Sequence, residues 1–110
     1  MVSNPSRLLV QRGINETFIT FNDRELLDEA VIKQLDQEIM GLVSEENLKN
    51  FLLDFSNVDF MSSSFLGLLV KLHKRVTEKK GQLKLCNIDK KIKKVFKITQ
   101  LDKILNIDDK

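Results

Sequence analysis

The chain has few of the residues from which catalytic and metal sites are built: one histidine, one cysteine, no tryptophan and no tyrosine. A serine nucleophile needs a base within hydrogen-bond reach. The histidine, His73, lies ten residues beyond Ser63; on a helix that is about 15 Å along the axis, too far to serve that serine. One histidine and one cysteine make no zinc ligand set. We therefore expect no enzyme activity, no catalytic residue, no metal site and no cofactor.

Proline, glycine and long apolar runs are also scarce. The only proline, Pro5, lies in a polar stretch, which predicts a flexible tail over residues 1–6 and one domain over 7–110. The four glycines are scattered and form no phosphate-binding loop. No apolar run approaches the roughly 20 residues of a membrane span, and the N-terminus lacks the apolar core of a signal peptide. Since Cys86 alone cannot form an internal disulfide, we expect a cytoplasmic protein with no membrane partner.

Charge is unevenly distributed along the chain, although the net charge is only +2. Residues 23–54 carry nine acidic and three basic side chains, whereas residues 71–97 carry eleven basic and two acidic ones. These stretches are either two solvated helix faces or surfaces for two different partners. Without tyrosine or tryptophan, no stacking platform accompanies the lysines. We therefore expect no nucleic-acid partner.

The 110 residues, 42% hydrophobic and 31% charged, are typical of one globular domain. Apolar periodicity predicts its elements. These are strands over 7–14 and 16–21, a helix over 26–43, a strand over 51–55, a helix from the serines onward, a strand over 82–88, a helix over 89–98, and a terminal helical turn and strand. The order ββαβαβα(β) indicates an α/β domain with a mostly parallel sheet.

Several positions indicate how these elements begin, end and pack. The first helix has two possible caps, one at Asn22 or Asp23 and one at Asp28. Gly67 interrupts an apolar helix face, which predicts a close contact between that helix and the sheet. Gly81 fits the left-handed position after a helix. Residues 51–55 are apolar at nearly every position, which favours a central strand.

Three consecutive serines, Ser62 to Ser64, stand where the strand at 51–55 leads into the second helix. One of them could simply cap the helix, since serine is a favoured capping residue. A second interpretation is phosphorylation, because the free N–H groups and the dipole at a helix N-terminus favour an anion. A phosphate there would change the surface that a partner meets without unfolding the domain.

The stretch FLLDFSNVDFMSSSFLGLLVKLHKRV, followed by a turn at Gly81 and LKLCNIDKKIKKVFKITQLDKIL, resembles a STAS domain. It is most similar to the bacterial anti-sigma-factor antagonists. The resemblance implies a mixed sheet with helices packed on one face. It also implies binding to an anti-sigma factor that is itself often a serine kinase. Phosphorylation of a serine at the start of the second helix blocks this binding, and a serine phosphatase reverses it.

Matching the family motif position by position places the phosphoacceptor at Ser63, with Ser62 and Ser64 as alternatives. The resemblance also implies that a protein partner contacts a set of residues around it. They are Asp28, Met61, Ser62, Ser63, Ser64 and Phe65. Two positions depart from the family. Ser62 replaces an aspartate, and Phe65 replaces a glycine, which adds bulk near the partner surface. The missing aspartate motivates an alternative function: a constitutive STAS scaffold or accessory subunit, in stress signalling or beside a transporter, without a phosphate cycle.

Overall fold

The computed structural model describes residues 7–108. The predicted flexible tail, residues 1–6, lies outside the described residues. Five strands form the main sheet in the order β1-β2-β4-β6-β7. Their bounds are β1 Leu8–Arg12, β2 Thr17–Phe21, β4 Asn50–Asp54, β6 Gln82–Cys86 and β7 Asn106–Ile107. β1 and β2 pair antiparallel, and the other neighbours pair parallel.

The predicted α/β order and the central place of the strand near 51–55 are therefore confirmed, and β1 and β2 form an antiparallel hairpin at one edge of the sheet. Along β2, β4 and β6, every second side chain is buried. Ile19, Leu53 and Leu85 belong to this inner row and are fully buried. The alternation follows from the pleat, which points successive side chains to opposite faces.

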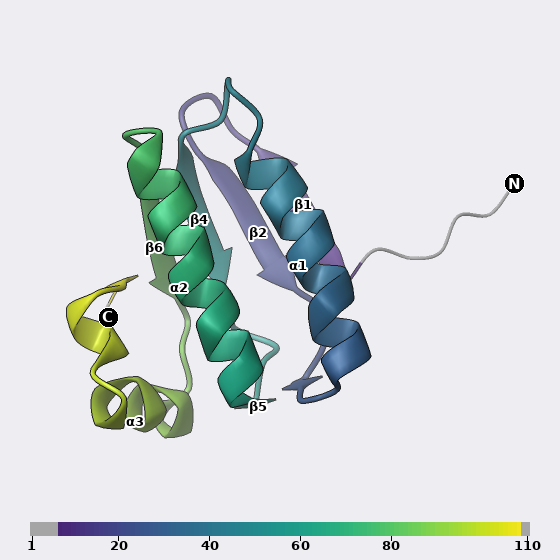
Figure 1. The fold of residues 1–110 in the computed structure, drawn as a ribbon, viewed down its shortest axis with the longest axis vertical. Helices are drawn as coiled ribbons and strands as arrows, with labels where there is room; N and C mark the ends of the chain where they lie inside the picture. Colours follow the sequence, from purple (N-terminus) through teal and green to yellow (C-terminus); the bar gives the residue numbers. More distant parts are fainter. Residues whose placement is uncertain (1–6, 109–110) are drawn as a thin grey trace, which may run out of the picture.

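Two long helices, α1 (Glu29–Val43) and α2 (Ser63–Glu78), lie side by side on one face of the sheet (Figure 1). The apolar side chains that recur at helical spacing along α2 all pack in the core: Phe65, Leu68, Leu69, Leu72 and Val76. A third helix, α3 (Lys90–Ile98), and the 3₁₀ helix η1 (Leu101–Lys103) lie below, towards the β7 edge (Figure 1).

The first helix begins later than predicted, at Glu29 instead of residue 26. Glu25 and Leu26 instead form strand β3 (Glu25–Leu26), which pairs in parallel with β5 (Phe60–Met61) in a second, two-stranded sheet. Asp28 is the cap that the structure uses, because its side chain accepts hydrogen bonds from the N–H groups of Ala30 and Val31.

Both predictions about glycine need correction. A Cβ on Gly67 would meet nothing within 4 Å, so no close helix–sheet contact explains this residue. At Gly81 no positive φ occurs; Lys80 adopts the left-handed conformation, with φ of 61°. Gly81 is needed for another reason: a Cβ there would collide with the carbonyl oxygen of Lys49. The glycine allows the backbone of β6 to pass directly beside the start of β4.

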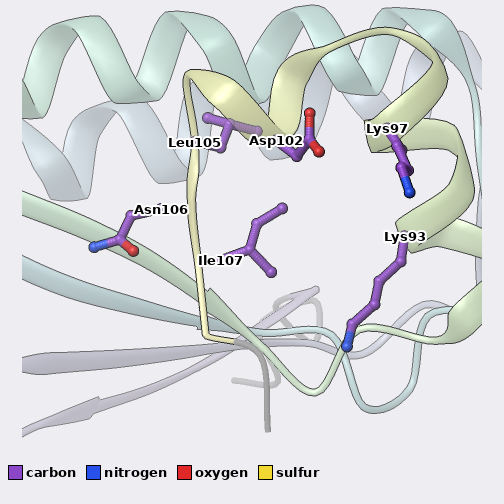
Figure 2. A pocket seen from close by; sticks show the side chains of 6 residues that line it. All are labelled: Lys93, Lys97, Asp102, Leu105, Asn106 and Ile107. Carbon is purple, nitrogen blue, oxygen red and sulfur yellow. The ribbon is translucent and has the colours of Figure 1, made fainter.

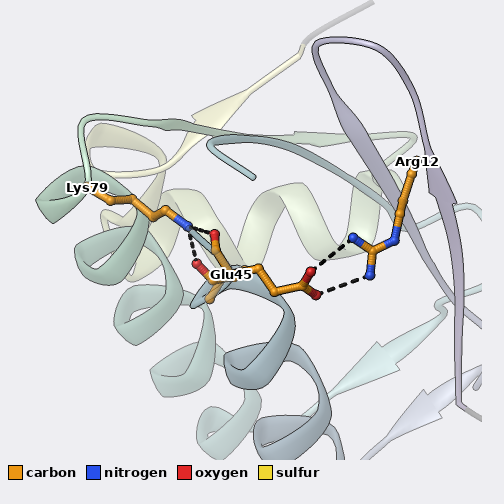
Figure 3. Close-up of polar contacts among 4 residues, drawn as sticks. Arg12, Glu45 and Lys79 are labelled. Carbon is orange, nitrogen blue, oxygen red and sulfur yellow. Dashed lines mark hydrogen bonds and ion pairs between the residues drawn. The ribbon is translucent and has the colours of Figure 1, made fainter. Parts of the chain in front are cut away.

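Polar side chains close the C-terminal end of α1, and one of them, Lys79, comes from the end of α2 (Figure 3). Arg12 donates two hydrogen bonds to the Glu45 carboxylate, each 3.1 Å long. The hydrogen bond from Arg12 lowers the pKa of Glu45. The Lys79 ammonium donates to the carbonyl oxygens of Val43 and Glu45, which would otherwise lack intrahelical partners. Burial lowers the pKa of Lys79. At this end of the helical layer, polar groups therefore find partners within the chain.

Candidate functional site: the serine corner

The serine corner, residues 60–65, is where β5 leads into α2, and its three serines have three different settings. Ser62 is the N-cap, and its hydroxyl accepts a hydrogen bond of 3.4 Å from the N–H of Phe65. The Ser64 hydroxyl donates a hydrogen bond of 2.7 Å to the Glu29 carboxylate. Ser63 is exposed, and no hydrogen bond links its hydroxyl to another described residue. Of the three hydroxyls, only that of Ser63 is both exposed and uncommitted.

The small β3–β5 sheet holds the serine corner beside the start of α1. Glu25 pairs with Phe60, and Leu26 pairs with Met61. The N–H of Ser62 then donates to the Leu26 carbonyl at 2.9 Å. Through these backbone bonds and the contact between Ser64 and Glu29, the N-termini of α1 and α2 lie side by side (Figure 1).

An ion pair between Arg24 and Asp59, with two hydrogen bonds to one oxygen, stabilises the same region from the loops. The Arg24 guanidinium donates to one carboxylate oxygen of Asp59 at 2.9 and 2.6 Å. The hydrogen bond to Asp59 raises the pKa of Arg24. The backbone carbonyl of Arg24 also accepts from the N–H groups of Asp59 and Phe60. The contacts fix the approach of the chain to the serines, and they leave the hydroxyl of Ser63 uncovered.

Phe65 does not lie at the surface, which corrects the prediction that it adds bulk where a partner binds. Its side chain is fully buried. Its ring meets those of Phe21 and Phe55 edge-on, with centroids 5.4 and 6.2 Å away. The position falls on the inner stripe of α2, where a large apolar side chain fills the core. Met61 is half-buried against the same core.

The other predicted contact residues cluster around Ser63. Asp28 is exposed and caps α1, next to the Glu29 that Ser64 contacts. Two exposed apolar side chains that the sequence analysis did not single out join them: Leu27 and Phe60, each 48% exposed. The Lys91 ammonium lies 4.7 Å from the centroid of the Phe60 ring, within cation–π range. Leu27 precedes the cap Asp28, so it lies outside α1 and does not belong to the apolar face of that helix. Its position before a capping aspartate is the sequence signal that could have identified Leu27 as a surface residue.

The first turn of α2 suits a negative charge. It contains no acidic residue, and the first N–H groups of a helix have no intrahelical partner. The helix dipole adds a partial positive charge there. Glu29, across from Ser64, is the acidic group that a new charge at the corner would meet. The start of α2 therefore favours an anion. The carboxylate of Glu29 lies close enough to be repelled by that anion.

A comparison with protein-family models decides the family. The model of the STAS domain matches residues 10–110. The chain belongs to the STAS domain family. The match covers α1, α2 and both strands of the small sheet that holds their N-termini together.

Solved structures share the fold of this STAS domain. An anti-sigma-factor antagonist (STAS) domain protein from Planctomyces limnophilus is 25% identical with a TM-score of 0.79; the match covers 92% of this chain and 87% of that one. An anti-sigma factor antagonist from Mycobacterium paratuberculosis is 20% identical with a TM-score of 0.78, covering 91% and 82%. The phosphorylated Bacillus cell fate determinant SpoIIAA is 19% identical with a TM-score of 0.71, covering 94% and 92%.

Within residues 7–108, no group of three or more histidine, cysteine, aspartate or glutamate side chains could hold a metal ion. No helix in the same range is both long and apolar enough to cross a membrane. What the serine corner offers is an exposed hydroxyl, that of Ser63, at the start of a long helix.

Proposed function

We propose that this STAS domain is an anti-sigma-factor antagonist of a partner-switching system that regulates transcription. In its unmodified form it binds an anti-sigma factor that is also a serine kinase, and so releases a sigma factor. Phosphorylation of Ser63 ends the binding, and a serine phosphatase restores it. The domain itself acts in the cytoplasm by binding and catalyses nothing. Its family and its structural resemblance to anti-sigma factor antagonists support this role.

The observation that carries the proposal is the state of the Ser63 hydroxyl. A kinase must bring the acceptor oxygen in line with the phosphorus that it attacks, so the oxygen has to be accessible. Ser63 is exposed and uncommitted, whereas Ser62 caps the helix and Ser64 donates to Glu29. Phosphorylating Ser62 would put a bulkier group in place of the hydroxyl that caps the helix, and phosphorylating Ser64 would remove the proton that it donates to Glu29. Ser63 is the acceptor whose modification disturbs the fold least.

A phosphate on Ser63 would act on the surface and not on the core. It would add about −1.5 to −2 charges at the start of α2, where the dipole and the free N–H groups favour an anion. SpoIIAA in its phosphorylated form still matches this fold with a TM-score of 0.71, which supports the expectation that a STAS domain keeps its structure when phosphorylated. The new charge would lie beside Glu29 and turn this part of the surface strongly negative.

The proposed partner surface surrounds Ser63. It includes the predicted contact residues that reach the surface, and it adds the two exposed apolar side chains beside them. The set is Leu27, Asp28, Phe60, Met61, Ser62, Ser63 and Ser64. Phe65 does not belong to this surface; its buried side chain anchors the first turn of α2 to the core. An apolar rim around a small polar centre is the kind of surface whose binding an introduced charge disrupts, because the charge would have to be desolvated.

Phosphopeptide mapping tests the proposal. The purified domain is incubated with ATP and a kinase-type anti-sigma factor from the same organism, and the modified residue is located by mass spectrometry. We expect one phosphate on Ser63 and none on the Ser63→Ala variant. Ser62→Ala, which keeps the acceptor, is the matched control. A domain left unmodified at all three serines would overturn the phosphate switch.

One departure from the family favours a second candidate function, that of a constitutive scaffold or accessory subunit. Ser62 stands where the family motif usually has an aspartate, so the carboxylate beside the acceptor is missing. A scaffold would bind its partner equally well with Ser63 or with an aspartate at that position. Binding of the Ser63→Asp variant to the same anti-sigma factor separates the two functions.

A further inference from the structure

A hollow of about 510 Å³ lies between α3, η1 and β7, away from the serine corner. Figure 2 shows its lining: Lys93 and Lys97 from α3, Asp102 from η1, and Leu105, Asn106 and Ile107 from the last stretch of chain. Leu105 is buried and Ile107 is half-buried, which gives the hollow an apolar part. Its volume is within the range of small-ligand sites. None of the residues of the serine corner lines it.

The helix that forms one wall of the hollow, α3, carries only positive charges. α3 has five lysines among its nine residues and no acidic one. Within the described residues, no salt bridge reaches four of these lysines: Lys90, Lys91, Lys94 and Lys97. Like charges three or four positions apart destabilise a helix by about 0.2–0.5 kcal/mol per pair. An acidic partner would relieve this repulsion.

The other wall is the free edge of a sheet. β7 pairs with β6 on one side, in the register Lys84 with Asn106 and Leu85 with Ile107. β7 is the last strand in the order of the main sheet, so no described strand covers its outer edge. An uncovered edge presents backbone N–H and C=O groups that can pair with another strand.

We propose that this hollow is a docking site for an extended acidic peptide segment of a partner protein. The segment adds along the outer edge of β7 and pairs with its backbone, as in β-strand addition. Its carboxylates face Lys93 and Lys97, and an apolar side chain between them contacts Leu105 and Ile107. Asp102, which lines the hollow from η1 (Figure 2), disfavours a carboxylate beside it, so the acidic residues of the segment point away from η1.

Three features favour a peptide over a free phosphate or a lipid surface. A phosphate would be held by the lysines alone and would make no use of the sheet edge or of the apolar part. A flat membrane surface would meet the outward face of α3 and would not enter the hollow. Only an extended acidic chain uses the cationic wall, the apolar part and the backbone edge together.

Nuclear magnetic resonance can test the site with the whole protein and a synthetic probe. The ¹⁵N-labelled chain is titrated with a short acidic peptide in which glutamate and valine alternate. We expect chemical-shift changes concentrated at Lys97, Asn106 and Ile107. The Lys97→Gln variant should weaken binding about tenfold, and Lys93→Gln should do the same. The control is Lys33→Gln, which removes an exposed lysine from α1 and should leave binding unchanged.

Companion probes decide what the site recognises. A peptide with N-methyl groups on the amides that face β7 should lose binding, because it cannot pair with the strand edge. Equal binding of that peptide would overturn the strand-addition mode. Inorganic phosphate or phosphatidylglycerol vesicles that give the same shifts, with the same loss in Lys97→Gln, would overturn the peptide assignment. A folded Lys97→Gln variant, checked by its thermal melting, that binds as tightly as the parent would overturn the site.

Discussion

Helices α1 and α2 both begin just after a strand of the same two-stranded sheet, but different side chains close their first turns. At α1, the carboxylate of Asp28 accepts from two N–H groups at 2.7 and 3.2 Å. At α2, the neutral Ser62 accepts from one N–H group at the longer distance of 3.4 Å. One helix start already contains its anion and the other does not. The comparison teaches that the start of α2, next to the exposed Ser63, has no side-chain anion of its own.

Charging the open helix start should have the largest effect. The Ser63→Asp variant places a carboxylate in the proposed partner surface, and we expect binding of the anti-sigma factor to fall roughly a hundredfold. Ser63→Ala should bind as the parent does. Calorimetric titration of both variants provides the measurement. A folded Ser63→Asp variant that binds normally would favour the scaffold function.

Removing the anion from the closed helix start is the reverse experiment. Asp28→Ala leaves the first N–H groups of α1 without a side-chain acceptor, and the free energy of unfolding should fall by about 1 kcal/mol. Ser62→Ala should cost less, about 0.5 kcal/mol, because its single hydrogen bond is long. Urea denaturation of the two variants gives both values. Equal losses would show that the two caps do not differ as their geometry indicates.

Making the two helix starts alike should have a smaller, stabilising effect. The Ser62→Asp variant restores the aspartate that the family motif usually has, and a carboxylate at this position should add about 0.5 kcal/mol through the dipole and the free N–H groups. The gain should shrink in high salt, because the site is near the surface. Thermal melting at low and high salt tests this, and a lower melting temperature at low salt would contradict it.

The link between the two helix starts should give the smallest effect. A double-mutant cycle with Ser64→Ala and Glu29→Gln isolates the 2.7 Å hydrogen bond between them, and we expect a coupling of about 0.5 kcal/mol at this exposed position. Phosphorylated protein should show a weaker coupling, since the charge on Ser63 repels Glu29. An unchanged coupling after phosphorylation would argue against communication between Ser63 and α1.

The serine corner shows where sequence patterns succeed and where they mislead. Phe65 is spaced helically with Leu68 and Leu72 on the apolar face of α2, whereas its place in the family motif suggested a contact with the partner. Its complete burial agrees with the spacing. Periodicity reports which face of a helix is apolar, and that is a local property. A motif match carries no information about how a substituted side chain turns into the core.

The sequence by itself determined the elements whose apolar residues repeat regularly: the hairpin, the central strand, α2 and the order that makes the sheet mostly parallel. It also placed three serines at the start of a helix. The tertiary structure decided the rest, because the deciding contacts join residues far apart in sequence. Two-residue strands such as β3 and β5 have no period to detect, and Gly81 is required by the Lys49 carbonyl of another segment. Likewise, the Ser64 hydroxyl donates a hydrogen bond to Glu29, 35 residues away in sequence. That contact distinguishes Ser64 from Ser63.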